Sequence, residues 1–110
     1  MPPASSTIIN GTVSGNTASE KGGGIFVNVG IVDISGAIEN NTANDDGGGV
    51  YMNGGSINFN SGNRVENNSA NADNSGTETG GGIYHQSGTI TGTPNYSGNY
   101  PDNCDGPGGC

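Results

Sequence analysis

Apolar residues in this chain occur in short runs in which every second position is apolar. The clearest pairs are Ile25 and Val27, Val32 and Ile34, and Ile57 and Phe59. A spacing of two places side chains on one face of a β-strand, whereas a helix would need apolar residues three and four positions apart. The absence of leucine and the 23 glycines also disfavour helix. The pattern therefore predicts an all-β protein built from short strands and tight turns.

One ten-residue phrase occurs three times along the chain. It reads KGGGIFVNVG, DGGGVYMNGG and TGGGIYHQSG, beginning at Lys21, Asp46 and Thr79. The triple glycines begin at positions 22, 47 and 80, and we place the additional residues of the second, longer interval in a loop around Asn74. A second phrase runs in step with the first, as VSGNTA, IENNTA, VENNSA and YSGNYP. A period of this length is typical of a solenoid, a propeller or an array.

Short strands that recur with this period and stack on similar neighbours predict a parallel β-helix. We expect about four rungs with three short strands in each, the first and last rungs being incomplete. The β-helix should occupy residues 7–104, after an N-terminal tail at 1–6 and before a Gly/Pro loop at 105–110. A single rung buries little apolar surface, but stacked rungs share one core and pair their backbone groups.

Glycine and asparagine recur at the corners of the expected rungs. Glycine permits backbone conformations closed to other residues, where neighbouring rungs come close together. Asparagine tolerates left-handed backbone geometry, and identical asparagines one rung apart can hydrogen-bond into a ladder. The predicted ladder consists of Asn16, Asn41, Asn68 and Asn99.

The repeated motifs resemble those of a known family. GGGI at 22–25 and 80–83, and GGGV at 47–50, occur with VSGN, IENN, VENN and YSGN. Together they resemble the GGA[ILV] and FxxN repeats of polymorphic outer membrane protein adhesins. Glycine stands here in place of the alanine, and valine, isoleucine or tyrosine in place of the phenylalanine. The resemblance covers residues 7–104 and implies a right-handed β-helix of the kind found in secreted bacterial proteins.

Three aromatic residues follow the triple glycines in the same register. If Ile25 and its equivalents face the core, alternation sends Phe26, Tyr51 and Tyr84 outward, stacked about 4.8 Å apart on adjacent rungs. Such an exposed ladder of aromatic rings could bind sugar rings or a neighbouring chain. Alternatively, the rings stack on one another and only make that face more rigid.

Charge excludes several classes of partner. The net charge is −8, and Lys21 and Arg64 are the two basic residues. A nucleic-acid-binding protein needs a row of basic residues to neutralise phosphates, so we expect no nucleic-acid partner. No apolar run approaches the roughly 20 residues of a membrane-spanning helix, and we expect no membrane insertion.

Catalytic and metal-binding residues are sparse. Glu39 and Glu66 occupy one column, and the expected separation of one rung is near the ~5 to 5.5 Å that retaining glycosidases use. However, we expect these carboxylates on a flat, solvated strand beside Arg64, without the cleft that catalysis requires. The acidic loop residues Glu20, Asp45, Asp46, Asp73 and Glu78 could take up Ca²⁺ weakly or simply be solvated. His85 has no second histidine to pair with, and we expect it to be partly buried near the last rung. We therefore expect no enzyme activity, cofactor or metal.

The two cysteines, Cys104 and Cys110, lie six positions apart in the segment CDGPGGC. This spacing favours a local disulfide over a metal site, which would need more ligands. A disulfide indicates an oxidising, extracellular setting.

A β-helix exposes an unpaired strand edge at each end, and such edges are templates for another chain. Two explanations remain open: the chain is a piece of a longer β-helix, or one subunit docks on the next to form a filament. We expect a non-enzymatic extracellular structural protein that polymerises head to tail with itself. The alternative is an adhesin-like module that binds polysaccharide or a cell-surface glycan through the aromatic ladder, and a carbohydrate-active enzyme is the remote third class.

Overall fold

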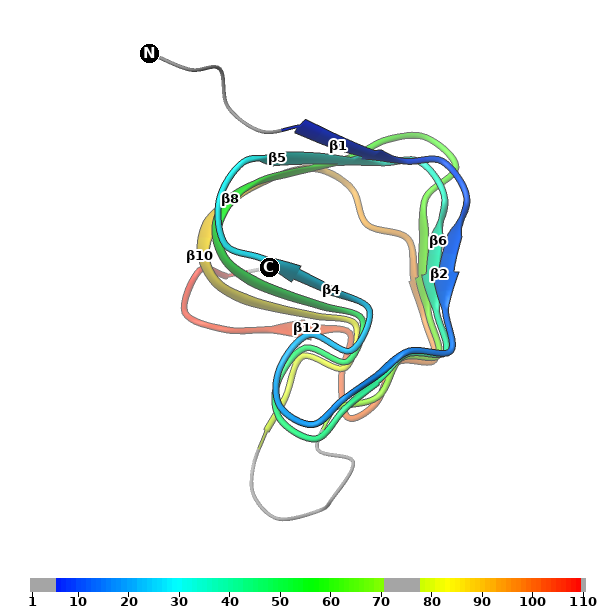
Figure 1. The fold of residues 1–110 in the computed structure, drawn as a ribbon, viewed down its shortest axis with the longest axis vertical. Coiled ribbons are helices and arrows are strands. Elements are labelled where there is room, and N and C mark those ends of the chain that lie inside the picture. Colours follow the sequence, from blue (N-terminus) through cyan, green and yellow to red (C-terminus); the bar gives the residue numbers. More distant parts are fainter. Residues whose placement is uncertain (1–5, 71–77, 110) are drawn as a thin grey trace.

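The described part of the computed structural model, residues 6–70 and 78–109, consists of strands, turns and loops without a helix (Figure 1). The strands are β1 Ser6–Ile9, β2 Thr12–Ser14, β3 Thr17–Ala18, β4 Ile25–Val27, β5 Ile31–Ile34, β6 Ala37–Glu39, β7 Thr42–Ala43, β8 Val50–Phe59, β9 Arg64–Glu66, β10 Ile83–Gly92, β11 Tyr96–Ser97 and β12 Cys104–Asp105. The all-β class predicted from the alternating apolar pattern is confirmed.

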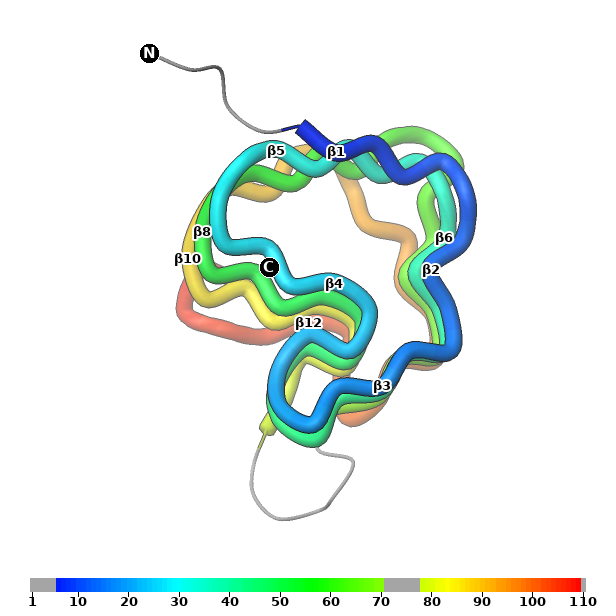
Figure 2. The backbone as a smooth tube through the Cα atoms, viewed as in Figure 1, coloured from blue at the N-terminus to red at the C-terminus, as the bar shows by residue number. Residues whose placement is uncertain are grey.

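Strands from successive sequence repeats lie side by side. The largest sheet has the order β1-β5-β8-β10-β12, and β4 also pairs with β8. A second sheet has the order β11-β9-β6-β2, and β3 pairs with β7. Every pairing between these named strands is parallel. Parallel neighbours require the chain to leave a sheet and come back to it, and Figure 2 shows the tube following nearly the same path on each return.

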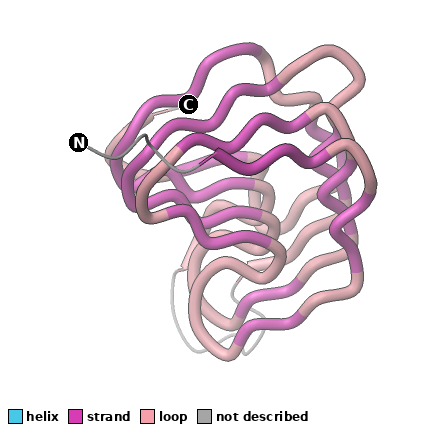
Figure 3. The backbone as a smooth tube through the Cα atoms, turned by 45° about the horizontal axis from the view of Figure 1, so that its top comes forward, coloured by secondary structure: helices cyan, strands magenta, loops and turns pink. Residues whose placement is uncertain are grey.

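The register of the sheets reproduces the spacing of the sequence motifs. In the largest sheet, Ser6 pairs with Ile31, Ile31 with Ser56 and Ser56 with Thr89. The steps from Ile31 to Ser56 and from Ser56 to Thr89 equal the two intervals between successive triple glycines. Equivalent residues of different repeats therefore lie next to one another, as the neighbouring magenta strands in Figure 3 illustrate.

Alternate positions of these strands form one apolar core. Its buried members are Val27, Val32, Ile34, Ile38, Val50, Met52, Ile57, Phe59, Val65 and Ile83. Burial is deepest in the middle repeats and declines toward both ends, where Ile9, Ile90 and Tyr96 are only partly buried. Removing apolar surface from water is favourable, and the apolar side chains at the two ends of the core still expose some of their surface to water.

The three glycines of each motif have different roles. Gly47 has a φ of +74°, a left-handed conformation that most side chains avoid. A Cβ atom on Gly48 would collide with the carbonyl group of Ser69 and lie 2.6 Å from the carbonyl oxygen of Gly81. The first glycine therefore makes the turn, and the second allows backbones of adjacent repeats to approach.

Two strands are longer than the sequence pattern predicts. The segments that form β4 and β5 in one repeat are joined in β8 and β10, each of ten residues. Gly55 and Gly88, both with positive φ, bend these strands without ending them, and β10 shifts its register on β8 around Ser87. The strands also reach slightly beyond the expected boundaries, because β1 begins at Ser6 and β12 includes Asp105.

Candidate functional site

The two ends of the stacked sheets present unpaired strand edges. At one end the outermost strands are β1, β2, β3 and β4. At the other end they are β11, β12 and residues 89–92 of β10. Within residues 6–70 and 78–109, no strand pairs with the outer side of any of these segments. Such edges expose backbone donors and acceptors to any strand that can approach.

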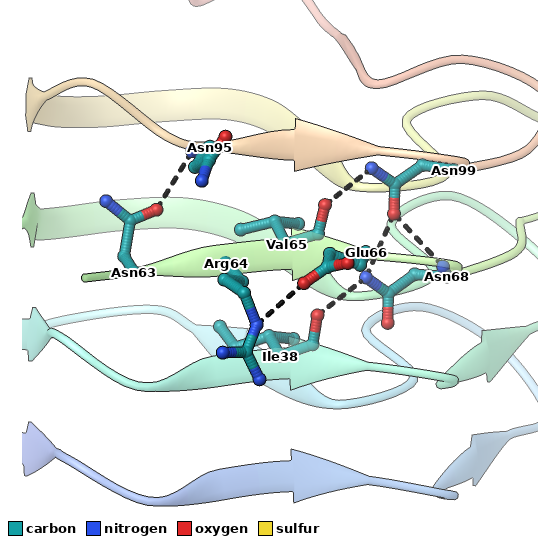
Figure 4. Close-up of polar contacts among 8 residues, drawn as sticks. All are labelled: Ile38, Asn63, Arg64, Val65, Glu66, Asn68, Asn95 and Asn99. Carbon is teal, nitrogen blue, oxygen red and sulfur yellow. Dashed lines mark hydrogen bonds and ion pairs between the residues drawn. The ribbon is translucent and has the colours of Figure 1, made fainter.

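The four predicted ladder asparagines lie in one column and are joined by side-chain hydrogen bonds. In the middle of the column, Nδ2 of Asn41 donates to Oδ1 of Asn68 at 3.0 Å, and Nδ2 of Asn68 donates to Oδ1 of Asn99 at 3.0 Å. The same Nδ2 of Asn68 donates to the carbonyl oxygen of Ile38 at 2.9 Å (Figure 4). Asn41 and Asn68 are fully buried, so the middle of the ladder lies inside the protein, whereas Asn16 at its first end is exposed.

The ladder has a direction and two unlike ends. Asn16 donates from its backbone N and from Nδ2 to Oδ1 of Asn41, both at 3.1 Å. Within the ladder, each asparagine thus donates to the Oδ1 of the asparagine in the later repeat, and the Oδ1 of Asn16 is left at the first end. At the last end, Nδ2 of Asn99 donates to Oδ1 of Asn103 at 3.1 Å. Asn103 accepts the bond that a further ladder asparagine would accept.

The three predicted aromatic residues also form one column. The ring centroids of Phe26 and Tyr51 are 5.1 Å apart, and those of Tyr51 and Tyr84 are 5.3 Å apart, with both pairs stacked. The expectation that all three rings are exposed is wrong for Tyr51, which is only 7% exposed. Stacking covers both faces of its ring, and Cβ lies against the turn at Gly47. Phe26, at the end of the stack, is 51% exposed.

Charged residues surround this aromatic column. The ammonium group of Lys21 lies 5.6 Å from the ring centroid of Tyr51, in a cation–π contact. Burial raises the pKa of Tyr84, and the negative charges of Asp46 and Asp105 raise it further. Lys21 precedes β4 in the chain, whereas Asp105 belongs to β12. Lys21 thus comes before the first ring of the column in the chain, whereas Asp105 lies in the strand beyond the last ring.

A cavity of about 630 Å³ opens at the end formed by the last repeat. Its lining includes His85, Ile90, Pro94, Tyr96, Gly108 and Gly109. His85 is 5% exposed, so it is more buried than the partial burial predicted from the sequence. Burial of the Tyr96 phenol raises its pKa to about 12. The cavity lies where the core loses its next layer of apolar side chains.

The carboxylates considered for catalysis are part of ordinary sheet structure. Glu39 and Glu66 are register partners in β6 and β9. Nε of Arg64 lies 2.7 Å from Oε1 of Glu66, so this carboxylate is in an ion pair (Figure 4). The described residues contain no group of three or more His, Cys, Asp or Glu side chains that could hold a metal ion. Asp73, named above as a loop residue, lies outside the described residues.

Two further sequence predictions fall partly or wholly outside the described part of the chain. The predicted disulfide of Cys104 involves Cys110, which is not described. The loop predicted around Asn74 is also not described. Both remain predictions.

Other polar contacts had no repeated signal in the sequence. Asn63 is 5% exposed; its Nδ2 donates to the carbonyl oxygens of Asn60 and Thr93, and its Oδ1 accepts from the backbone N of Asn95 at 2.9 Å. Oδ1 of Asp102 accepts from two backbone N–H groups of the last triple glycine, at 2.7 and 3.1 Å. Asparagine and aspartate are so frequent in this chain that composition alone could not single these residues out.

No protein-family model, curated protein or solved structure matches this chain. No helix capable of crossing a membrane occurs in the segments 6–70 and 78–109. Function must therefore be inferred from the geometry of the chain itself.

Proposed function

We propose that this protein is a non-enzymatic, extracellular structural subunit, folded as a right-handed parallel β-helix of about four rungs with three short strands in each. In this proposal, its rungs dock end to end on those of another copy and build filaments or surface fibres. The resemblance of the repeats to adhesin repeats supports the handedness and the extracellular setting.

One observation supports this proposal above the others. Each column of paired strand segments in the described part of the chain begins with an unpaired edge at one end of the protein and finishes with an unpaired edge at the other end. One column contains residues 6–9, 31–34, 56–59 and 89–92, and another contains residues 25–27, 50–52, 83–85 and 104–105. The segment at one end of each column is therefore the repeat equivalent of the segment at the other end. A second copy could place its β1 beside residues 89–92 and its β4 beside β12, so that both columns would continue in parallel register.

The interior would continue across the same contact. Ile90 and Tyr96 at one end, and Ile9 at the other, are only partly buried in a single copy. Docking would remove this apolar surface from water. It would also bring Oδ1 of Asn16 to the end of the ladder at which Asn99 donates to Asn103. The direction of the asparagine-to-asparagine bonds allows this contact in the head-to-tail sense, with Oδ1 of Asn16 taking the place of Oδ1 of Asn103 as the acceptor for Asn99.

Charge also favours head-to-tail contact. Lys21 lies in the loop before the edge strand β4, and Asp105 lies in the edge strand β12. When β4 of one copy lies beside β12 of another, these opposite charges approach. The contact is heterologous, and a heterologous contact that does not close into a ring propagates as a fibre.

Electron microscopy of the untagged, unreduced chain over a concentration series would test the proposal. We expect filaments with an axial repeat of about 19 Å, which corresponds to four rungs at about 4.8 Å each. Particles that remain single copies at every concentration would contradict end-to-end docking. Disordered aggregates without an axial repeat would also count against it.

Two charge-reversal variants provide a matched comparison. Lys21→Glu and Arg64→Glu each change the net charge by the same amount, but Lys21 lies next to an edge strand and Arg64 lies on the side of β9. We expect Lys21→Glu to raise the concentration at which filaments appear, by about tenfold, and Arg64→Glu to leave it nearly unchanged. Equal effects of the two variants would indicate a general charge effect and would contradict a contact at the ends.

A second candidate function is glycan binding by an adhesin-like module. It is favoured by the exposed ring of Phe26, since sugars stack on accessible aromatic faces. Saturable binding of the single subunit to a glycan array, lost in Phe26→Ala, would support this function. Product formation from a polysaccharide that Glu66→Gln abolishes would instead support the remote enzyme class.

A further inference from the structure

The single histidine of the chain occupies an unusual position at the edge of the cavity. In the register of the sheet, His85 lies beside Met52, and Met52 lies beside Val27. The ring therefore stands where earlier repeats place an apolar core residue, and it is 5% exposed. A buried polar ring is costly unless its nitrogens are hydrogen-bonded.

Both ring nitrogens of His85 face backbone carbonyl oxygens. Nδ1 lies 2.8 Å from the oxygen of Gly109, and Nε2 lies 2.9 Å from the oxygen of Gly88. A carbonyl oxygen can only accept, so each nitrogen must carry a proton to make its bond. A neutral imidazole has one N–H group, whereas the charged ring has two. The observed contacts are therefore complete only when the ring is protonated on both nitrogens.

The segment that follows β12 is fitted closely to this ring. The backbone N of Gly108 donates to the carbonyl oxygen of His85 at 2.8 Å. A Cβ atom on Gly106 would collide with the backbone of His85, and one on Gly108 would lie 2.8 Å from its ring. Residues 106–109 thus lie against His85, Gly108 and Gly109 line the cavity with it, and the glycines make this approach possible.

We propose that residues 106–109 form a strap beside the cavity that His85 holds against its ring when the ring carries two protons and loosens when it loses one. Because the predicted disulfide between Cys104 and Cys110 would close this loop, the movement is a loosening of Gly108 and Gly109 and not the release of a chain end. With one proton, the ring can keep its bond to Gly88 or to Gly109, but not both. Closing the strap therefore takes up a proton, and rising pH favours opening.

Two other titratable groups near this end of the protein keep one charge state around neutral pH. Tyr96 lines the same cavity, and burial raises the pKa of its phenol to about 12. Asp105 is exposed, and hydrogen bonds from the Thr79 side chain and from the backbone N of Gly106 lower the pKa of its carboxyl group. Tyr96 is therefore neutral and Asp105 charged throughout. The strap does not depend on end-to-end stacking, and it can be tested on single copies.

Nuclear magnetic resonance of the ¹⁵N-labelled chain, at a concentration where it is a single copy, gives a direct test because its one histidine yields unambiguous ring signals. At the acidic end of a pH series we expect protons on both ring nitrogens. The exchange of the Gly108 amide proton, corrected for the intrinsic effect of pH, should then become about tenfold less protected as the ring loses one proton. The two titrations should share a midpoint. Constant protection of Gly108 while the ring titrates would overturn the proposal.

Variants separate this effect from a purely structural role of the ring. His85→Gln keeps a neutral donor in place, and we expect the protection of Gly108 to be independent of pH in this variant. Tyr96→Phe removes the other titratable group of the cavity lining and should leave the wild-type pH profile unchanged. If His85→Gln keeps the pH dependence, the strap is not controlled by His85. If that variant does not fold, the proposal is still tested by whether the ring signals and the Gly108 protection of the wild-type chain share one midpoint.

Discussion

Nδ2 of Asn41 donates to Oδ1 of Asn68 at 3.0 Å, and both residues are fully buried. The backbone N of Asn41 donates to the same oxygen, also at 3.0 Å. Each asparagine thus binds a side chain and the backbone of an adjacent repeat. Because an unpaired amide is costly in an apolar interior, only one register of the repeats satisfies the whole column.

The buried ladder should be more important for stability than its exposed end. Asn68→Ala removes the side-chain donor to the carbonyl oxygen of Ile38 and the acceptor of the Asn41 backbone N. It also leaves Nδ2 of Asn41 with only its bond to the carbonyl oxygen of Val13. We expect the free energy of unfolding to fall by about 3 kcal/mol or more. Asn16→Ala at the exposed end should cost less than about 1 kcal/mol. Urea denaturation of the two variants would measure the difference, and equal losses would contradict the importance of burial.

The close approach of neighbouring backbones at Gly48, the second glycine of its motif, predicts that an added methyl group is more destabilising there than at an open glycine. In Gly48→Ala the new methyl group meets the Ser69 carbonyl group and the Gly81 carbonyl oxygen, neither of which is a flexible side chain. We expect a loss of unfolding free energy on the order of 3 kcal/mol. Gly11→Ala is the control, because a Cβ there has no neighbour within 4 Å. Thermal unfolding followed by circular dichroism would compare them, and tolerance of Gly48→Ala would mean that the repeats can separate at this point.

Sequence periodicity was sufficient for much of this architecture. Residues such as Ile31 and Ser56 are register partners because they occupy equivalent places in successive motifs, and a regular interval constrains which segments can lie side by side. The asparagine column was equally visible, since each member occupies the same place in its motif. Side-chain alternation also separated Phe26 from the inward-facing Val27.

Features that occur only once could not be predicted in this way. Tyr51 has the same sequence context as Phe26, but it has a ring on each side, and therefore it is buried. The contacts of His85 with Gly88 and Gly109 depend on how the last segment folds back, which no repeat specifies. Position within the stack, rather than the local sequence, determines exposure at these residues.

Left-handed backbone geometry at the corner after β6 gives another testable contrast. Asn40 has a φ of 57°, and Gly15 one repeat earlier has a φ of 68°. We expect Asn40→Gly to change the free energy of unfolding by no more than about 0.5 kcal/mol. Asn40→Val should lower it by about 1–2 kcal/mol, because a branched side chain is strained in this conformation. Asn53→Val is the control, because Asn53 is exposed on β8 and does not have a positive φ. We expect this variant to keep its free energy of unfolding in urea denaturation. Similar losses for the two valine variants would exclude backbone strain as the cause.

Alkaline pH should destabilise the protein through Tyr96. Burial raises the pKa of its phenol to about 12, compared with an ordinary value of 10.0. Between these values the unfolded chain releases the proton more readily than the folded protein does, so the free energy of unfolding falls as pH rises. We expect the loss between about pH 9 and pH 11 to be smaller in Tyr96→Phe than in the wild type, when measured by urea denaturation. Tyr100→Phe, at a ring that is 59% exposed, should behave like the wild type. An equal alkaline loss in Tyr96→Phe and the wild type would mean that the Tyr96 phenol is hydrated in solution, and that the end of the core beside the cavity is more open than its packing indicates.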